Sequence, residues 1–396
     1  MNIKQAKTIC DNYICNTYPD RKLLLTHGSG CFVYDSDGKK YLDFLSGLAV
    51  SSLGHGNKFL AKALVNQAQK LIHTSNLYHN IPQLELAQLL GKRLKEYKLF
   101  FCNSGAEANE AAIKLSRKYH SNPDKTEIIT FKNSFHGRTI ATVTATGQTK
   151  YNEAFKPLLP TFHYADFNNM ESVVKLVSKK TGAIMLELIQ CEGGVNIADK
   201  KFIKDLFEFC KKKGILLIID EVQTGSGRTG KFFSFQHFGI TPDIFSAAKG
   251  IAGGVPMGIM FAKKNIAAAF KPGDHASTFG GTPLVCAAAL EVVKFLSPQK
   301  LKEIHAKGEY FKKILNKEKH PLIKNIRGIG LMIGIELNTE CAAAVQATCE
   351  KNGLILNSIQ NKILRLAPPL IVTNSELDAA VKIIVKSLYE IEGCKK

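Results

Sequence analysis

Long apolar runs, paired cysteines and arginine are all scarce in this chain of 396 residues. No apolar run approaches the ~20 residues that a membrane-spanning helix needs, and the first residues, MNIKQAK, lack the apolar core of a signal peptide. The ten cysteines include no CxxC pair and no Cys/His cluster at the spacing of a zinc site. These absences predict a cytoplasmic protein with reduced thiols and no bound metal.

Arginine makes up only seven of the 53 basic residues, although the formal net charge is +19. A charge of that size would ordinarily indicate nucleic-acid binding. The basic residues are spread along the whole chain, however, and their longest block is Lys211–Lys213. This pattern disfavours a nucleic-acid surface. Each arginine instead becomes a candidate for a position where a forked donor is required.

The length and the arrangement of apolar segments predict an α/β protein of about two domains. Apolar residues make up 45% of the chain and charged residues 22%, as in soluble globular proteins. Short apolar runs, which end in polar or glycine-rich residues, alternate with helical patterns. This alternation predicts a large, mostly parallel sheet with helices on both faces.

The stretch from 214 to 258 carries the strongest chemical signal. Residues 215–219 are apolar and rich in isoleucine, so they predict a buried strand that ends at Asp220. A second apolar run, 243–249, ends at Lys249. If the two strands are neighbours, a carboxylate and an amine meet at the edge where α/β sheets bind ligands. The acid could then keep a cofactor's ring nitrogen protonated while the lysine forms a Schiff base with its aldehyde. On these two residues alone, an ordinary strand-end acid and a surface lysine are the favoured interpretation, and the rest of the chain has to decide.

Further candidates follow other predicted strands. Ser104 precedes a helix, and the small residues Gly105 and Ala106 would let a phosphate reach the free amides of its first turn. The alternative is a helix cap made by Ser104 alone. Phe135 could stack on a flat ring, and Arg138 could bind a carboxylate with both arms of its fork.

The same pattern recurs in residues 183–194, where Glu187 and Glu192 lie near a strand end. Ser277 and Thr278 offer hydroxyls in a polar loop. Tyr78 could line a site or pack in a loop.

A glycine-rich segment, 225–230, matches GxGxxG but does not predict a nucleotide site. Its first glycine lies five residues beyond Asp220, too far for the tight strand-to-helix turn. Phe232 stands where a phosphate loop has a hydroxyl, and KFFSF reads as a loop or a strand.

The two ends of the chain are predicted to form a smaller α+β domain. Residues 31–44 contain a hairpin pattern around Asp37-Gly38, residues 57–72 predict a helix, and residues 285–396 combine two long helical patterns with short strands. We therefore predict a large domain over 56–275 and a small domain built from 1–55 and 276–396.

Seven blocks along the chain resemble the class III, ornithine-type aminotransferases of the pyridoxal-phosphate fold type I superfamily. The greatest similarity is to the acetylornithine aminotransferases of arginine biosynthesis. The blocks are FFCNSGAEANEAAIKL (100–115), SFHGRT (134–139), IIDEVQTGSGRTGKFF (218–233), AAKGIAGGVPMG (247–258), STFGGTPL (277–284), RGIGLMIGIE (327–336) and LRLAPPL (364–370).

The resemblance implies a homodimer that binds pyridoxal 5'-phosphate and moves the δ-amino group of N2-acetyl-L-ornithine to 2-oxoglutarate. The products would be N-acetyl-L-glutamate 5-semialdehyde and L-glutamate, formed with ping-pong kinetics. It implies catalytic roles for Lys249 and Asp220. It also implies cofactor contacts by Gly105, Ala106, Phe135, Val222, Gln223 and, from the partner subunit, Thr278. Substrate contacts are implied for Arg138, Ser277 and a glutamate–arginine pair, Glu192 and Arg365.

Two departures from the family pattern leave the substrate open. The usual EPxQGEGG has Leu188 for the proline and Cys191 for a glycine, beside Glu192, and the usual GGNP has Thr282. Ornithine, succinylornithine, succinyl-diaminopimelate and 4-aminobutyrate are the alternative substrates. A catalytically inactive or nucleic-acid-binding protein would also account for the charge, although intact Lys249 and Asp220 argue against it.

Overall fold

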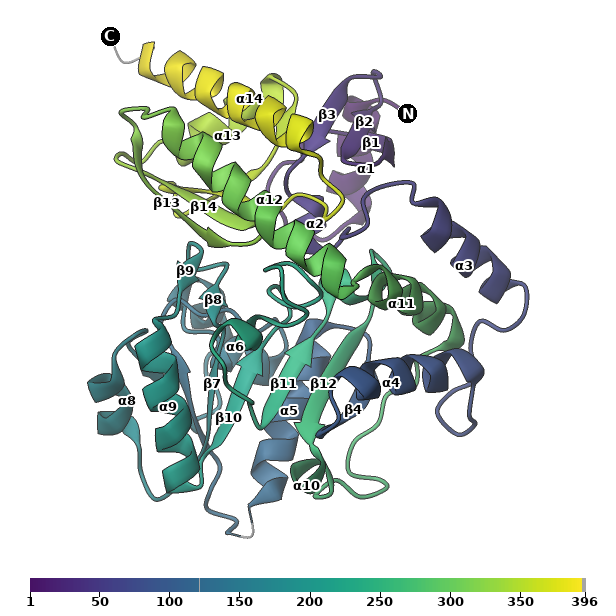
Figure 1. Cartoon of the computed structure of the whole chain (residues 1–396), viewed down its shortest axis with the longest axis vertical. Coiled ribbons are helices and arrows are strands. Elements are labelled where there is room, and N and C mark those ends of the chain that lie inside the picture. Colours follow the sequence, from purple (N-terminus) through teal and green to yellow (C-terminus); the bar gives the residue numbers. More distant parts are fainter. Residues whose placement is uncertain (121, 394–396) are drawn as a thin grey trace.

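A seven-stranded sheet occupies the lower half of the molecule in Figure 1. The computed structural model describes residues 1–120 and 122–393. Only β12 runs antiparallel to its neighbours, so the predicted mostly parallel sheet is confirmed. In spatial order the strands are β4 (Tyr97–Cys102), β12 (Gly258–Lys263), β11 (Ile244–Ala247), β10 (Leu216–Asp220), β7 (Thr181–Leu186), β5 (Glu127–Phe131) and β6 (Phe162–Ala165).

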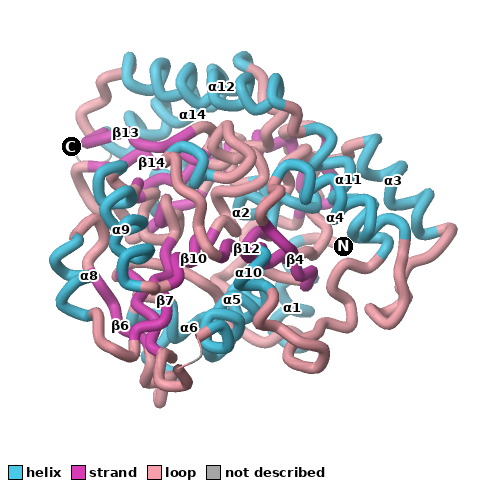
Figure 2. The backbone as a smooth tube through the Cα atoms, turned by 60° about the horizontal axis from the view of Figure 1, so that its bottom comes forward, coloured by secondary structure: helices cyan, strands magenta, loops and turns pink. Residues whose placement is uncertain are grey.

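Both faces of this sheet are covered by helices because its central strands are apolar on both sides. In β10, Leu217 and Ile219 belong to a core shared with α9 (Lys200–Lys213). Leu216 and Ile218 belong to a second core, which they share with α5 (Gly105–Tyr119) and α6 (Ile140–Ala145). Figure 2 shows α9 and α5 on different sides of the strands. Burial on both faces is the reason that a continuous apolar run, rather than an alternating one, marks this strand.

The end of α9 fixes where β10 begins. Gly214 takes a left-handed conformation (φ 61°) and its amide binds back to the helix, a common helix stop. Lys211–Lys213 form the last turn, where positive charge complements the helix dipole. The longest basic block of the sequence therefore has a structural role in a helix end.

Two further four-stranded sheets lie in the upper part of Figure 1. One has the order β1 (Leu25–Ser29), β2 (Phe32–Asp35), β3 (Lys40–Asp43), β15 (Leu354–Ile355), and the other β13 (Ile323–Ile329), β14 (Met332–Leu337), β17 (Ile363–Leu366), β16 (Asn357–Ile359). The predicted hairpin is β2–β3, and β15 pairs with β3 in parallel, which joins the two ends of the chain. The helices here are α12 (Pro298–Lys317), α13 (Ala342–Lys351) and α14 (Asn374–Gly393).

The remaining elements connect these layers. The predicted helix over 57–72 is α3, capped by Asn57. Next to it, α11 (Pro283–Phe295) packs against α3 and α4. The sequence analysis predicted two long helical patterns after residue 285 and did not separate α11 from them. The division of the chain into a large and a small domain, with boundaries at residues 55 and 275, stays a prediction. The elements are α1 (Ile3–Tyr13), α2 (Ser46–Ala49), α3 (Lys58–Ala68), α4 (Ile81–Arg93), α7 (Thr149–Asn152), α8 (Met170–Leu176), α10 (Lys264–Ala267), α11 (Pro283–Phe295), a small hairpin β8 (Ile189–Gln190) and β9 (Asn196–Ile197), and the 3₁₀ turns η1 (Glu153–Phe155), η2 (Ser234–His237) and η3 (Lys249–Ala252).

None of the helices in the described ranges, 1–120 and 122–393, combines the length and the apolar character that crossing a membrane would require.

Candidate active site

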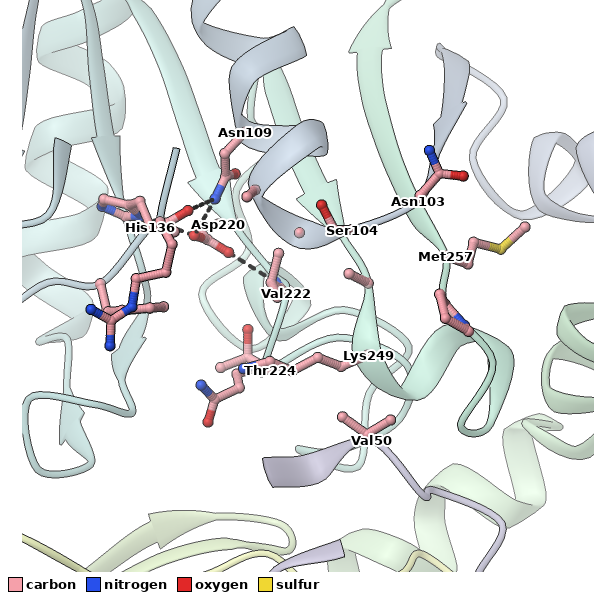
Figure 3. A pocket seen from close by; sticks show the side chains of 18 of the residues that line it. Val50, Asn103, Ser104, Asn109, His136, Asp220, Val222, Thr224, Lys249 and Met257 are labelled. Atoms are coloured by element: carbon pink, nitrogen blue, oxygen red, sulfur yellow. Dashed lines mark hydrogen bonds and ion pairs between the residues drawn. The ribbon is translucent and has the colours of Figure 1, made fainter. Parts of the chain in front are cut away.

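A cavity of about 380 Å³ opens at the carboxyl ends of β10 and β11, facing the first turn of α5 (Figure 3). Its size is that of a small-molecule site. The predicted residues that line it are Gly105, Ala106, Phe135, Arg138, Asp220, Val222, Gln223 and Lys249. Lining residues to which the sequence assigned no role include Val50, Asn103, Asn109, His136, Glu187 and Met257.

Asp220 is held rigidly at the closed end of the cavity. One carboxylate oxygen, Oδ2, lies 2.8 Å from Asn109 Nδ2 and 2.8 Å from His136 Nδ1. The other, Oδ1, accepts from the Val222 amide at 2.9 Å. A carboxylate can only accept, so His136 Nδ1 carries the hydrogen. Ser246 Oγ is a fourth donor, 3.4 Å from Oδ1, so four donors fix the orientation of an acid that is only 4% exposed (Figure 3).

Sequence reasoning missed Asn109 and His136, although signals for both were present. Asn109 is a buried amide in an alanine-rich stretch of α5, four residues after Gly105 and hence on the same helical face. His136 stands beside Phe135 in the SFHGRT block. A polar residue on an otherwise apolar helix face is expected to have a specific partner.

Lys249 lies beyond the end of β11, which stops at Ala247, and begins η3. The strands β10 and β11 are parallel neighbours, as the sequence analysis supposed, and the structure pairs Asp220 with Ser246. Lys249 has a left-handed φ of 50°, an unfavourable conformation for a non-glycine residue that tends to persist where function requires it. Burial lowers the pKa of its amine below the ordinary value for lysine, and the charge of Arg365 acts in the same direction. A larger neutral fraction makes this amine a better nucleophile and base.

The first turn of α5 forms the wall opposite Lys249. Ser104 caps the helix, since its Oγ accepts from the Glu107 amide at 3.1 Å. The amides of Gly105 and Ala106 are not used inside the helix and are available to an anion. The capping interpretation is therefore correct and leaves room for the phosphate interpretation.

The structure adds a second reason for glycine at 105. A Cβ there would lie 2.7 and 2.8 Å from the two methyl groups of Val222.

Glu192, Gln223 and Arg365 form a polar cluster beside the cavity. Arg365 Nη1 lies 2.5 Å from Glu192 Oε1 and 3.1 Å from Gln223 Oε1, and Gln223 Nε2 lies 3.2 Å from the same glutamate oxygen. Burial alone would raise the pKa of Glu192, but the Arg365 guanidinium outweighs it and holds that pKa below its usual value. Of these three residues, only Gln223 lines the cavity, and its side chain connects Glu192 and Arg365 to the cavity wall.

Glu187 is a second carboxyl group inside the cavity wall. It is 5% exposed, and its Oε2 accepts from the Phe135 amide at 2.9 Å. Burial and the nearby charge of Asp220 raise its pKa well above the ordinary value for glutamate. Its neutral form is thereby favoured near Asp220, and it fixes the backbone of Phe135.

Two predicted residues from the polar loop lie outside this cavity. Ser277 is linked to it indirectly, because its Oγ accepts from Asn103 Nδ2 at 3.1 Å. Thr278 is exposed and does not line the cavity of its own chain. Tyr78 is 71% exposed, so in the single chain it neither lines this cavity nor packs in its loop.

The residues that depart from the family pattern do not line the cavity. Leu188 and Cys191 are fully buried in the apolar core, and Glu192 keeps its arginine partner. Thr282 occupies the position just before α11, where threonine and asparagine are both favoured. In the glycine-rich segment, residues 225–230 form turns and no α-helix follows them, as predicted.

Comparison with known proteins places the chain in a family. The model of the class-III aminotransferases matches residues 14–388. The chain belongs to this family. The predicted fold class, enzyme class and pyridoxal-phosphate cofactor are thereby confirmed.

Relatives of known name cover almost the whole chain. It is 47% identical to the acetylornithine aminotransferase of Caldanaerobacter subterraneus subsp. tengcongensis, over 96% of this chain and 98% of that protein. Among solved structures it resembles the ornithine aminotransferase of Toxoplasma gondii (TM-score 0.95, 30% identity, 99% and 96% covered). It also resembles the acetylornithine aminotransferase of Elizabethkingia anophelis (TM-score 0.87, 33% identity, 98% and 100% covered).

The residues present fit pyridoxal phosphate. Among the described residues, neither lysine nor arginine forms an ion pair with Asp220, so a protonated ring nitrogen would supply the missing positive charge. The free amides at the start of α5 suit the phosphate, and the amine of Lys249 suits the aldehyde. Each chemical feature of the cofactor thus has a complementary group in one cavity.

Proposed function

We propose that this aminotransferase transfers the δ-amino group of N2-acetyl-L-ornithine to 2-oxoglutarate, in the cytoplasm, as a step of arginine biosynthesis. The observation that carries the substrate is the 42–47% identity, over nearly the full chain, to relatives named acetylornithine aminotransferase. The products are N-acetyl-L-glutamate 5-semialdehyde and L-glutamate.

The chain's own residues divide the work of this reaction. When bound, pyridoxal phosphate supplies an electron-withdrawing ring that stabilises negative charge on the substrate carbon. Asp220, fixed by its four donors, keeps the ring nitrogen protonated. Lys249 takes a proton from the δ-carbon of the donor and, in the half-reaction with 2-oxoglutarate, delivers a proton to the α-carbon of the glutamate that forms; a lowered pKa is favourable for both transfers. Phe135 and Val222 supply the apolar contacts of the ring.

Arg138 binds the α-carboxylate of the amino donor. While the amino donor is bound, Glu192 and Arg365 stay in contact, and the glutamate neutralises the charge of the arginine. When it opens, Arg365 binds a carboxylate of 2-oxoglutarate. Ser277, linked to the cavity through Asn103, lies near the acylated end of the donor.

A homodimer completes the site. Residues 75–83, a loop that leads into the first turn of α4, are joined to loop 277–281 by hydrogen bonds from Asn76 and Gln83. The large exposed apolar side chains on these two segments, at 62–86% exposure, form a patch suited to a second copy of the chain. They are Leu77, Tyr78, Ile81 and Phe279. Thr278 lies beside this patch, so in a dimer it would bind the cofactor phosphate of the partner subunit.

A half-reaction tests the substrate. The cofactor-loaded protein, without 2-oxoglutarate, is mixed separately with N-acetylornithine, ornithine, succinylornithine and 4-aminobutyrate while the visible absorbance of the cofactor is followed. We expect N-acetylornithine to bleach the absorbance fastest. If another amine bleaches the absorbance faster, that amine is the preferred substrate and the proposed chemistry still holds. Activity in Lys249→Ala would contradict the chemistry itself.

Mixing of two variants tests the dimer. Homodimers of Thr278→Ala and of Lys249→Ala should both have an impaired site. In a mixed dimer, one site combines the intact Lys249 of one subunit with the intact Thr278 of the other, so one site per dimer should regain its affinity for the cofactor. Sedimentation of the single variant Leu77→Asp should show monomers. A dimer unaffected by that charge would contradict this interface.

A further inference from the structure

The guanidinium of Arg138 lies over an aromatic ring that the sequence did not single out. Its Cζ is 4.3 Å from the ring centroid of Tyr151 and 5.5 Å from that of Phe135. The two rings meet edge to face, with centroids 5.4 Å apart and planes at 78°. Tyr151 belongs to the short helix α7 and is partly buried. It therefore contacts both the proposed carboxylate-binding residue and the proposed ring-stacking residue.

Arg138 lacks the usual means of orienting a guanidinium. Among the described residues, the arginines in carboxylate ion pairs are Arg327 and Arg365, and Arg138 is not one of them. A protein carboxylate would hold Arg138 in place but would also neutralise it and compete with a substrate carboxylate. An aromatic face attracts the cation without neutralising it.

We propose that Tyr151 is a positioning residue that holds the guanidinium of Arg138 toward the cavity and leaves its charge free for the substrate's α-carboxylate. The proposal rests on the proposed role of Arg138. Because Arg138 is largely exposed, the contribution of one such contact is that of an exposed pair, equivalent to about a two- to fivefold change in affinity.

Binding of an unreactive ligand tests this role apart from catalysis. N-acetylnorvaline is N-acetylornithine without its terminal amine, and calorimetry gives its dissociation constant for the cofactor-loaded enzyme. We expect Tyr151→Leu and Tyr151→Met, which lack a ring, to bind it about two- to fivefold more weakly. Tyr151→Phe keeps the ring face and should bind like the unaltered protein.

A neighbouring cation provides the matched control. Lys150 Nζ lies 4.6 Å from the same ring centroid, and the side chain is exposed. Lys150→Gln removes this charge and keeps Tyr151 and Arg138 in contact, so binding of N-acetylnorvaline should not change. An equal loss in Lys150→Gln would assign the effect to local charge and overturn the proposal.

A second substrate identifies the group that is recognised. N-acetylputrescine is N-acetylornithine without the α-carboxylate. In the half-reaction, Tyr151→Leu should raise the half-saturating concentration of N-acetylornithine and leave that of N-acetylputrescine unchanged. Equal effects on both amines, or ring-free variants that lose the cofactor spectrum and melt early, would make Tyr151 a structural residue only. Arg138→Lys separates the two proposals: if it leaves N-acetylnorvaline binding intact, the role of Arg138 itself fails.

Discussion

Gly105→Ala is predicted to weaken cofactor binding by forcing Val222 into the cavity. The added Cβ would lie 2.7 and 2.8 Å from the two Val222 methyl carbons, well inside ordinary contact distance. Overpacking of this kind costs about 1–3 kcal/mol. Without cofactor, Val222 can relieve the clash by moving into the empty space. The bound ring forces it back, so the strain appears in binding. The dissociation constant of pyridoxal phosphate should rise about five- to hundredfold.

Equilibrium titration of the apo-protein with pyridoxal phosphate measures this constant. The decisive comparison is with Val222→Ala, which removes both clashing methyl groups and leaves the Val222 Cβ at 3.4 Å. In that background, Gly105→Ala should have little effect, giving a strong coupling between the two sites. Gly91→Ala in α4 is the matched control, because a Cβ there meets nothing within 4 Å. If Gly105→Ala weakens binding equally in both backgrounds, the clash is not the cause.

Three further predictions follow from groups that line the cavity. Glu187→Gln should raise the melting temperature near neutral pH. Because the pKa of Glu187 is raised in the folded state, the folded state binds more protons than the unfolded state, and the stability of the natural protein falls as the pH rises above the unfolded pKa. An unchanged or lower melting temperature of the variant would contradict this sign. Lys249→Met in the apo-protein should also stabilise at neutral pH. There the lowered folded pKa makes the natural protein less stable as pH falls, and a pH-independent difference between the two melting curves would refute the assignment. Asn109→Ala removes a hydrogen bond to the Asp220 carboxylate, a contact of about 1.5–3 kcal/mol, so the affinity for the cofactor should fall about tenfold or more. Asn109→Asp also adds repulsion between two carboxylates, so its affinity for the cofactor should fall further.

The sequence alone determined the architecture and the chemical centre because both are encoded in short contiguous segments. The apolar run before Asp220 predicts a strand buried on both faces, and parallel neighbours place their carboxyl ends at one edge. If the two strands are neighbours, Asp220 and Lys249 meet at that edge, and in the structure both line the same cavity.

Only the tertiary structure decided what surrounds that centre, because those contacts join segments far apart in the chain. The Asn109–Asp220 contact spans 111 residues and was not predicted. The Glu192–Arg365 pair spans 173 residues, and the family resemblance, not the local sequence, predicted it. Nothing local in either segment specifies the partner. Tyr151 was not predicted for the same reason: its contact with Arg138 joins α7 to a separate loop, and the local sequence does not encode such a contact. For Thr278, the local sequence shows only a hydroxyl in a polar loop and the family resemblance assigns it to the partner subunit; the structure shows that it is exposed and does not line the cavity of its own chain.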